Sequence, residues 1–210
     1  MVNNRWEYGG AYKKYDMTGI IEVGLGKLKV HDIFDNLPEF MKEADCIFVD
    51  PPCSKGNLNS FYTKADSVEY KESYEPFKSR LFCCIDEINP DNLFIEVFKS
   101  NKDDFVREVE KRYKYVRIFH SYYYHNKKNK CWIIQGTREK SKLLSIDNLD
   151  EEDFIKYVCK NVEYSCIGDL CMGRGLVGYN SFLNNKKFVG TELNEKRLAV
   201  LVDKICKFYE

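Results

Sequence analysis

Several features that would assign the chain to a large functional class are missing from it. Nine cysteines include no Cys-x-x-Cys pair, so neither a zinc site nor a disulfide framework is indicated. No apolar run is long enough to cross a membrane, and the first residues lack the apolar core of a signal peptide. Acidic and basic residues balance at 33 each, so any grip on nucleic acid has to come from local basic patches. We therefore expect a soluble protein of a reducing, cytoplasmic compartment.

The order of apolar and polar segments predicts an α/β fold. A chain of 210 residues is long enough for one domain with a sizeable core. Predicted strands alternate with predicted helices, which is typical of a doubly wound, mostly parallel sheet, and a late hairpin supplies an antiparallel edge. The predicted strands are 19–34 (as two short strands), 46–49, 92–99, 115–124, 130–137, 165–170 and 188–192. The predicted helices are 37–43, 74–88, 103–113, 151–160, 175–184 and 194–208; residues 53–72 are expected to form a long loop.

Residues 50–53, Asp-Pro-Pro-Cys, are the most informative part of the sequence. They follow the apolar run 46–49, whose continuous hydrophobicity is typical of a strand buried on both faces. Proline fixes φ and has no N–H, so the backbone after the strand cannot rejoin the sheet. The result is a rigid ledge with a carboxylate and backbone carbonyls, groups that accept protons from an amine. We call residues 50–53 the ledge.

A glycine-rich turn follows the strand near the carboxyl end of the chain. Residues 169–175 read Asp-Leu-Cys-Met-Gly-Arg-Gly, between a predicted strand and a predicted helix. Glycines there let the backbone approach a ligand, and the helix beyond offers unpaired N–H groups. Glu192 ends the next predicted strand, a place where an acid binds ribose hydroxyls in doubly wound sheets. A nicotinamide-dependent dehydrogenase is the competing interpretation, since Gly173, Gly175 and Gly178 fit its glycine spacing.

Together these two segments resemble the S-adenosylmethionine-dependent amino-methyltransferases of nucleic acids, which carry Asp/Asn/Ser-Pro-Pro-aromatic at the ledge. The ledge precedes the cofactor turn, an order that resembles the permuted class, which includes DNA adenine-N6 methyltransferases of bacteria and phages. The resemblance implies a Rossmann-like methyltransferase sheet over residues 1–210, with 1–18 as an amino-terminal arm and no separate target-recognition domain. It also implies transfer of a methyl group from S-adenosyl-L-methionine to an exocyclic amine, most simply N6 of adenine in DNA.

The resemblance assigns roles to residues of both segments. The catalytic set it implies is Asp50, Pro51, Pro52 and Cys53, with Asp50 and the Pro51 carbonyl holding the amino group. The cofactor set is Asp169, Leu170, Cys171, Met172, Gly173, Gly175, Glu192 and Leu193, with Asp32 facing the adenine ring. His31, one of three histidines, is interpreted as structural.

The predicted loop after the ledge and the tip of the predicted hairpin supply candidates for substrate binding. Amide, aromatic and cationic side chains there suit base edges and phosphates. The candidates are Lys55, Asn57, Asn59, Phe61, Tyr62, Lys64, Lys127 and Lys128. The expected partner is nucleic acid, DNA before RNA, with a homodimer or a partner specificity subunit compensating for the missing recognition domain and no membrane involved.

Cys53 stands where the family has an aromatic residue, and this leaves two alternatives open. The run 50–54 also resembles the ledge of cytosine-5 methyltransferases, in which a cysteine thiolate attacks the base. Lys55 is the candidate cation for lowering the pKa of that thiol. The other alternative is a catalytically weak subunit that binds cofactor or nucleic acid on behalf of a partner enzyme.

Overall fold

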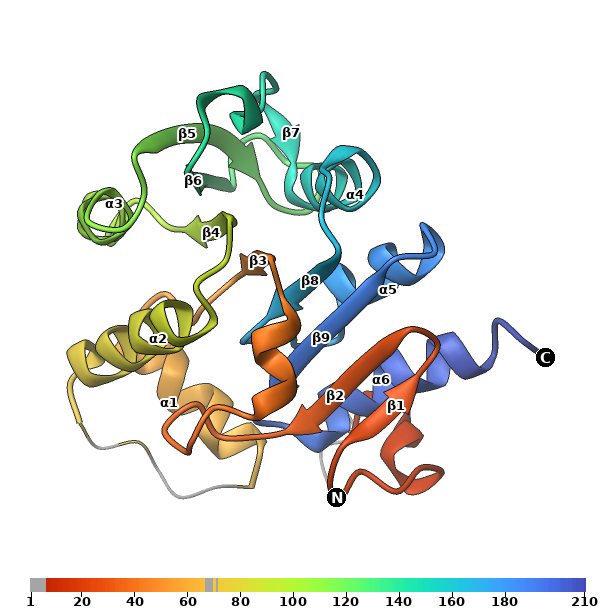
Figure 1. Cartoon of the computed structure of the whole chain (residues 1–210). Coiled ribbons are helices and arrows are strands. Elements are labelled where there is room, and N and C mark those ends of the chain that lie inside the picture. Colours follow the sequence, from red (N-terminus) through yellow and green to blue (C-terminus); the bar gives the residue numbers. More distant parts are fainter. Residues whose placement is uncertain (1–6, 67–69, 71) are drawn as a thin grey trace.

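The computed structural model describes residues 7–66, 70 and 72–210 and contains one mixed sheet (Figure 1). The strand order is β1-β2-β9-β8-β3-β4-β6-β5-β7. Five neighbouring pairs are parallel, and the pairs β1–β2, β4–β6 and β5–β6 are antiparallel. The strands are β1 (Ile21–Val23), β2 (Gly26–Val30), β3 (Cys46–Val49), β4 (Asn92–Val97), β5 (Tyr115–Tyr122), β6 (Lys130–Thr137), β7 (Leu149–Asp150), β8 (Cys166–Asp169) and β9 (Lys187–Glu192).

Helices cover both faces of this sheet, as in a doubly wound fold. They are α1 (Lys55–Lys64), α2 (Tyr74–Ile88), α3 (Lys102–Glu110), α4 (Glu151–Asn161), α5 (Leu176–Leu183) and α6 (Glu195–Cys206), with short 3₁₀ helices at Tyr8–Lys13, Glu39–Glu43 and Lys140–Lys142. The predicted α/β fold, mostly parallel with an antiparallel hairpin towards one edge, is confirmed. Among the described residues, no helix combines the length and apolarity needed to span a membrane.

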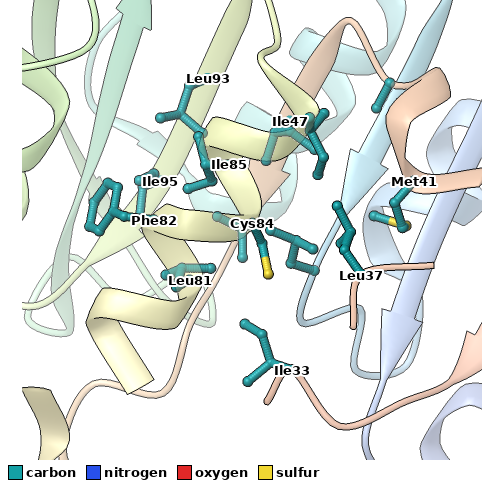
Figure 2. Packing of buried hydrophobic residues seen from close by; sticks show 14 of the residues in the cluster. Ile33, Leu37, Met41, Ile47, Leu81, Phe82, Cys84, Ile85, Leu93 and Ile95 are labelled. Atoms are coloured by element: carbon teal, nitrogen blue, oxygen red, sulfur yellow. The ribbon is translucent and has the colours of Figure 1, made fainter. Parts of the chain in front are cut away.

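The side-chain alternation of the central strands builds a separate core on each face. Ile47 and Val49 of β3 pack with α1, α2 and α3, whereas Cys46 and Phe48 pack with α4, α5 and α6. In Figure 2, Ile85 of α2 lies near Leu93 and Ile95 of β4, in the core that also contains Ile47. All four residues of β3 are buried, as its continuous apolar run predicted.

The sheet reverses its winding between β3 and β8. Strand β3 pairs in parallel with β8 on one side and with β4 on the other. From β8 the chain crosses through α5 to β9, and from β3 it crosses through α1 and α2 to β4, so the two crossovers leave in opposite directions. Ligands of open α/β sheets bind in the crevice at the carboxyl ends of such neighbouring strands. The ledge follows β3 and the 169–175 turn follows β8, so the two predicted segments meet at this point.

The interpretation of residues 53–72 as a loop is wrong, because residues 55–64 form α1. The Ser54 hydroxyl caps this helix by accepting a hydrogen bond from the Asn57 N–H at 3.2 Å. Leu58 and Tyr62, four residues apart, are buried on one face of the helix. Most other residues of this segment are polar. An apolar stripe of only two residues was too short to predict a helix from the sequence. Residues 67–69 and 71 of the predicted loop lie outside the described residues.

The expected amino-terminal arm is packed against the end of the chain in its described part. The 3₁₀ helix Tyr8–Lys13 lies on α6, and the Tyr15 hydroxyl donates to the Asp203 carboxylate at 3.1 Å. Residues 1–6 of the arm lie outside the described residues. Strand β7, two residues long, was not predicted; it pairs in parallel with β5 directly before α4.

Candidate active site

The ledge and the 169–175 turn open into one cavity of about 780 Å³. Most of the residues predicted from the sequence line it: Asp32, Asp50, Pro51, Pro52, Cys53, Asn57, Phe61, Tyr62, Asp169, Leu170, Cys171, Met172, Gly173, Glu192 and Leu193. Its volume falls within the range of small-molecule sites and leaves room for more than one ligand group. Segments more than a hundred residues apart in the chain thus form one site.

Six predicted residues do not line the cavity: Lys55, Asn59, Lys64, Lys127, Lys128 and Gly175. Lys55 begins α1 on its exposed side, and Lys127 and Lys128 are exposed at the hairpin tip. Asn129 and Lys130, next to them, do line the cavity. The roles of these lysines in substrate binding stay predictions.

The 169–175 turn satisfies most of its own polar groups. The Cys171 N–H donates to Asp169 Oδ1 at 2.9 Å, and the Gly173 N–H donates to Glu192 Oε2 at 2.6 Å. The Gly175 N–H donates to the Met172 carbonyl at 2.8 Å. The loop is therefore fixed in shape before any ligand arrives.

The two glycines of the turn serve different purposes. Both adopt positive φ, +57° at Gly173 and +78° at Gly175. A Cβ at Gly175 would lie 2.5 Å from the Leu201 Cβ of α6, whereas one at Gly173 would meet only the end of the Arg197 side chain, at 2.7 Å. Gly175 therefore packs the turn on α6, and Gly173 keeps the cavity wall close to Arg197.

Glu192 anchors the turn from the end of β9. Its second carboxylate oxygen, Oε1, accepts a hydrogen bond from the Asn194 N–H at 3.0 Å and lies 3.9 Å from a guanidinium nitrogen of Arg197. Two backbone N–H groups thus orient the carboxylate, and lone pairs remain for further hydroxyl donors. The position is the one expected for an acid that binds a ribose.

Asp50 stands open to the cavity at the end of β3. Its carboxylate is exposed to the cavity and makes no hydrogen bond to any described residue. The cavity walls around it reduce its hydration and raise the pKa of Asp50 to about 6, while the Arg197 guanidinium opposes the rise. Behind it, the Tyr74 hydroxyl donates to the Pro52 carbonyl at 2.5 Å, so the ledge is held from the α2 side.

Cys53 and Asp32 also belong to the cavity wall. The Cys53 N–H donates to Asn57 Oδ1 at 3.2 Å, and the half-buried thiol belongs to the cavity lining. Both Asp32 carboxylate oxygens accept from the Tyr62 hydroxyl, at 2.7 and 2.9 Å. His31 is half-buried, and burial lowers the pKa of its imidazole; its backbone N–H donates to the Glu192 carbonyl at 2.9 Å.

The same wall contains a group of charged and aromatic residues that were not among the candidate site residues. They are Glu96 and Phe98 at the end of β4, Tyr123 and Tyr124 after β5, Glu151 at the start of α4 and Arg197 in α6. Phe98 stacks on Tyr123 with ring centroids 5.3 Å apart, and Tyr124 is 80% exposed beside them. Two sequence signals indicated this group: an acid, Glu96, inside the apolar run of β4, and the mixture of aromatic and charged residues at the hairpin tip, which includes Tyr123 and Tyr124.

Asp169, the acid at the start of the turn, is deeply buried. It is 4% exposed, and burial raises the pKa of its carboxyl to about 8 against the opposing hydrogen bond from the Cys171 N–H. Within residues 7–66, 70 and 72–210, no three His, Cys, Asp or Glu side chains are grouped as a metal site.

Comparison with known proteins identifies the fold. The M1.HpyAVI–SAM complex matches with a TM-score of 0.56 at 12% identity, over 85% of this chain and 99% of that one. TTHA0409 from Thermus thermophilus, complexed with S-adenosyl-L-methionine, gives 0.56 at 12%, over 79% and 88%. PvuII DNA methyltransferase (cytosine-N4-specific) gives 0.51 at 10%, over 89% and 92%.

The sequence itself matches no protein-family model and no curated protein. At identities this low, the likeness concerns the fold alone. The chain therefore has the fold of these DNA methyltransferases.

Proposed function

We propose that the chain is an S-adenosylmethionine-dependent methyltransferase that acts on an exocyclic amino nitrogen of a nucleobase, with N6 of adenine in DNA as the first candidate. One observation carries the proposal: the Asp-Pro-Pro ledge and the glycine turn, on adjacent strand ends, open into a single cavity. The neighbours solved with this cofactor, and the cytosine-N4 specificity in the name of one of them, support the same reaction class.

The residues of the turn fit the cofactor. Glu192 keeps lone pairs for ribose hydroxyls, and Gly173 leaves the wall free of a side chain at the turn. Leu170, Met172 and Leu193 supply apolar lining. When bound, S-adenosylmethionine supplies an electrophilic methyl group on its sulfonium sulfur.

Asp50 and the Pro51 carbonyl then orient the acceptor. As a carboxylate, Asp50 accepts a hydrogen bond from the amino group and directs the nitrogen lone pair, so that catalysis is mainly positioning. The base reaches the cavity by leaving its stack. Tyr124 and Lys130 line the cavity on the side of the hairpin and suit the flanking strand, and Lys127 and Lys128 at the hairpin tip are further candidates for its phosphates. A homodimer or a partner subunit would supply sequence recognition.

The test is transfer of a labelled methyl group from S-adenosylmethionine to mixed DNA and RNA, followed by nucleoside analysis. N6-methyladenine in DNA is the expected product, and N4-methylcytosine would keep the chemistry but change the base. Bound cofactor without transfer to any nucleic acid would favour the binding-subunit alternative.

Cytosine-5 methylation is the second candidate, because the Cys53 thiol lines the cavity next to Asp50. In that reaction the thiolate adds to C6 of cytosine, C5 takes the methyl group, and loss of the C5 proton expels the thiolate. 5-Methylcytosine as the labelled product, together with a covalent complex on DNA containing 5-fluorocytosine, would establish this chemistry in place of the first.

A further inference from the structure

Glu96 is a buried acid that neither the fold nor the ledge explains. It lies on β4 and is 2% exposed, yet it belongs to the cavity lining. Its Oε1 atom is one of four buried side-chain oxygen or nitrogen atoms without a hydrogen-bond partner among the described residues. Tyr123 and Glu151 lie close enough to hydrogen-bond with the Glu96 carboxyl, and Oε1 itself is enclosed by protein. Buried polar groups in folded proteins are almost always fully paired, so a carboxyl that lines the cavity and keeps one oxygen unpaired points to a ligand.

The strand register places Glu96 beside Asp50. Strands β3 and β4 are parallel, with Phe48 opposite Phe94 and Val49 opposite Ile95. The next position sets Asp50 opposite Glu96, on the face where Phe48 stacks on Phe94 at 5.9 Å. The two carboxyls thus stand side by side, Asp50 open to the cavity and Glu96 set into its wall.

The surroundings of Glu96 keep its proton in place. Burial, followed by the charges of Asp50 and Glu151, raises the pKa of Glu96 well above its usual value. The ionisable groups that face it are Asp50 from β3, Glu151 from α4, Tyr123 after β5 and Cys131 from β6. None of them is a cation. The same crowding raises the pKa of Glu151 to about 7. Arg197 lowers the pKa of Asp50 and is not among the groups that act on Glu96 or Glu151, so Asp50 is the acid of the three that ionises most readily.

A neutral carboxylic acid beside a carboxylate is a matched donor and acceptor. The carboxylate accepts, and the acid donates one O–H hydrogen bond. An exocyclic amino group next to an unprotonated ring nitrogen on the Watson–Crick edge presents the complementary pattern, and among the DNA bases only adenine and cytosine carry it on that edge. Guanine has an N–H at that ring position, and thymine has no amino group.

We propose that Glu96 donates a hydrogen bond to the ring nitrogen next to the target amino group, N1 of adenine or N3 of cytosine, while Asp50 accepts from the amino group itself. Glu96 is then the residue that selects an amidine edge and rejects guanine and thymine. This inference rests on the proposed amino-methyltransferase function and names the part of the base that the site recognises.

The test replaces the ring nitrogen of the substrate by C–H. After the methylated base has been located by nucleoside analysis, oligonucleotides are made with 1-deazaadenine or 3-deazacytosine at that position. Wild type should lose roughly 10- to 100-fold in kcat/KM on the deaza oligonucleotide, because the buried Glu96 donor is left unpaired. Glu96→Ala should be weakened on the natural base to a similar extent and show almost no further loss on the deaza base.

Glu96→Gln separates this role from a structural one. Its amide N–H₂ can still donate, so we expect activity within about tenfold of wild type and loss of the alkaline limb of the pH–rate profile. Asp153→Asn, an exposed change in the first turn of α4, is the matched control. Melting temperature and cofactor Kd, measured for each variant, report folding separately from activity.

The outcomes distinguish the inference from the proposed function. An equal deaza penalty in wild type and Glu96→Ala would overturn the role of Glu96 and leave the methyltransferase assignment intact. Absence of any transfer by wild type to nucleic acid would overturn the proposed function, and this inference with it.

Discussion

At the end of β8 the 169–175 turn satisfies its own polar groups, whereas at the end of β3 the ledge leaves a carboxylate without a partner. Gly173 and Cys171 donate to acids of the same site at 2.6 and 2.9 Å. Asp50 makes no hydrogen bond within the described part of the chain, and the neighbouring Glu96 has an unpaired buried oxygen. The turn is thus built as a rigid receptacle, and the ledge carries polar capacity that a substrate has to complete.

Removing the unpaired carboxylate should have the largest effect. We expect Asp50→Ala to lower methyl transfer by at least about 100-fold, the range found when one aligned polar group is removed from a reacting centre. Cofactor Kd should change little, because the turn lies on another strand. Labelled transfer and calorimetric titration measure the two. Wild-type transfer by this variant would contradict the ledge assignment.

The rate of methyl transfer should depend in opposite ways on the ionisation of Asp50 and of Glu96. Asp50 acts as a carboxylate, so kcat/KM should fall about tenfold per pH unit below its pKa of about 6. Glu96 acts as a neutral acid, so activity should also fall as pH rises through the raised pKa of Glu96. A rate profile from pH 5 to 10 measures both limbs. A profile that does not fall at acidic pH would show that Asp50 does not act as a carboxylate, and would contradict the role given to the ledge.

The two glycines of the turn should differ when replaced. Gly175→Ala places a Cβ against the Leu201 Cβ and strains a positive φ, so we expect a loss of about 2–4 kcal/mol and a melting temperature lower by roughly 5–10 °C. Gly173→Ala meets only a flexible side-chain end, so its loss should be about 1 kcal/mol. Thermal melting of both variants checks the order. A larger loss at Gly173 would reverse the assignment of roles.

Stability itself should fall as pH rises from 5 to 8. The folded-state pKa values of Asp50, Glu151 and Asp169 are raised to about 6, 7 and 8. At pH values between the ordinary carboxyl pKa of the unfolded chain and these raised pKa values, the folded chain binds more protons than the unfolded chain. The free energy of unfolding therefore decreases as pH rises. We expect a melting temperature lower by at least roughly 2–4 °C at pH 8 than at pH 5. A melting temperature that rises over this range would show that the acids are not held in the predicted state.

The smallest effect is expected at Cys53, the ledge position where amino-methyltransferases of nucleic acids carry an aromatic residue. In amino methylation the Cys53 thiol neither transfers a proton nor forms a covalent bond. Cys53→Ser should therefore keep the rate of methyl transfer within about threefold of wild type. The labelled assay on the same DNA measures it. Complete loss, with cofactor binding intact, would move the chemistry to the thiol.

Local patterns in the sequence identified the strands that matter most. The uniform apolar run of β3, the prolines that end it and the glycines after β8 each act over a few residues, so their structural consequences can be inferred from neighbours in the chain. The hairpin β5–β6 and the helices α2, α4 and α6 followed from periodicity in the same way. Helix α1 was missed, because its buried stripe consists only of Leu58 and Tyr62.

The sequence by itself determined the alternation of strands and helices, the ledge and the glycine turn, because each depends on contacts between residues close in the chain. Only the tertiary structure decided that β3 lies between β8 and β4, and hence that Asp50 faces both the turn and Glu96. Strand order and register arise from side-chain packing between distant segments, and no short stretch of sequence contains that information. The acid pair at the centre of the site is therefore a product of the fold.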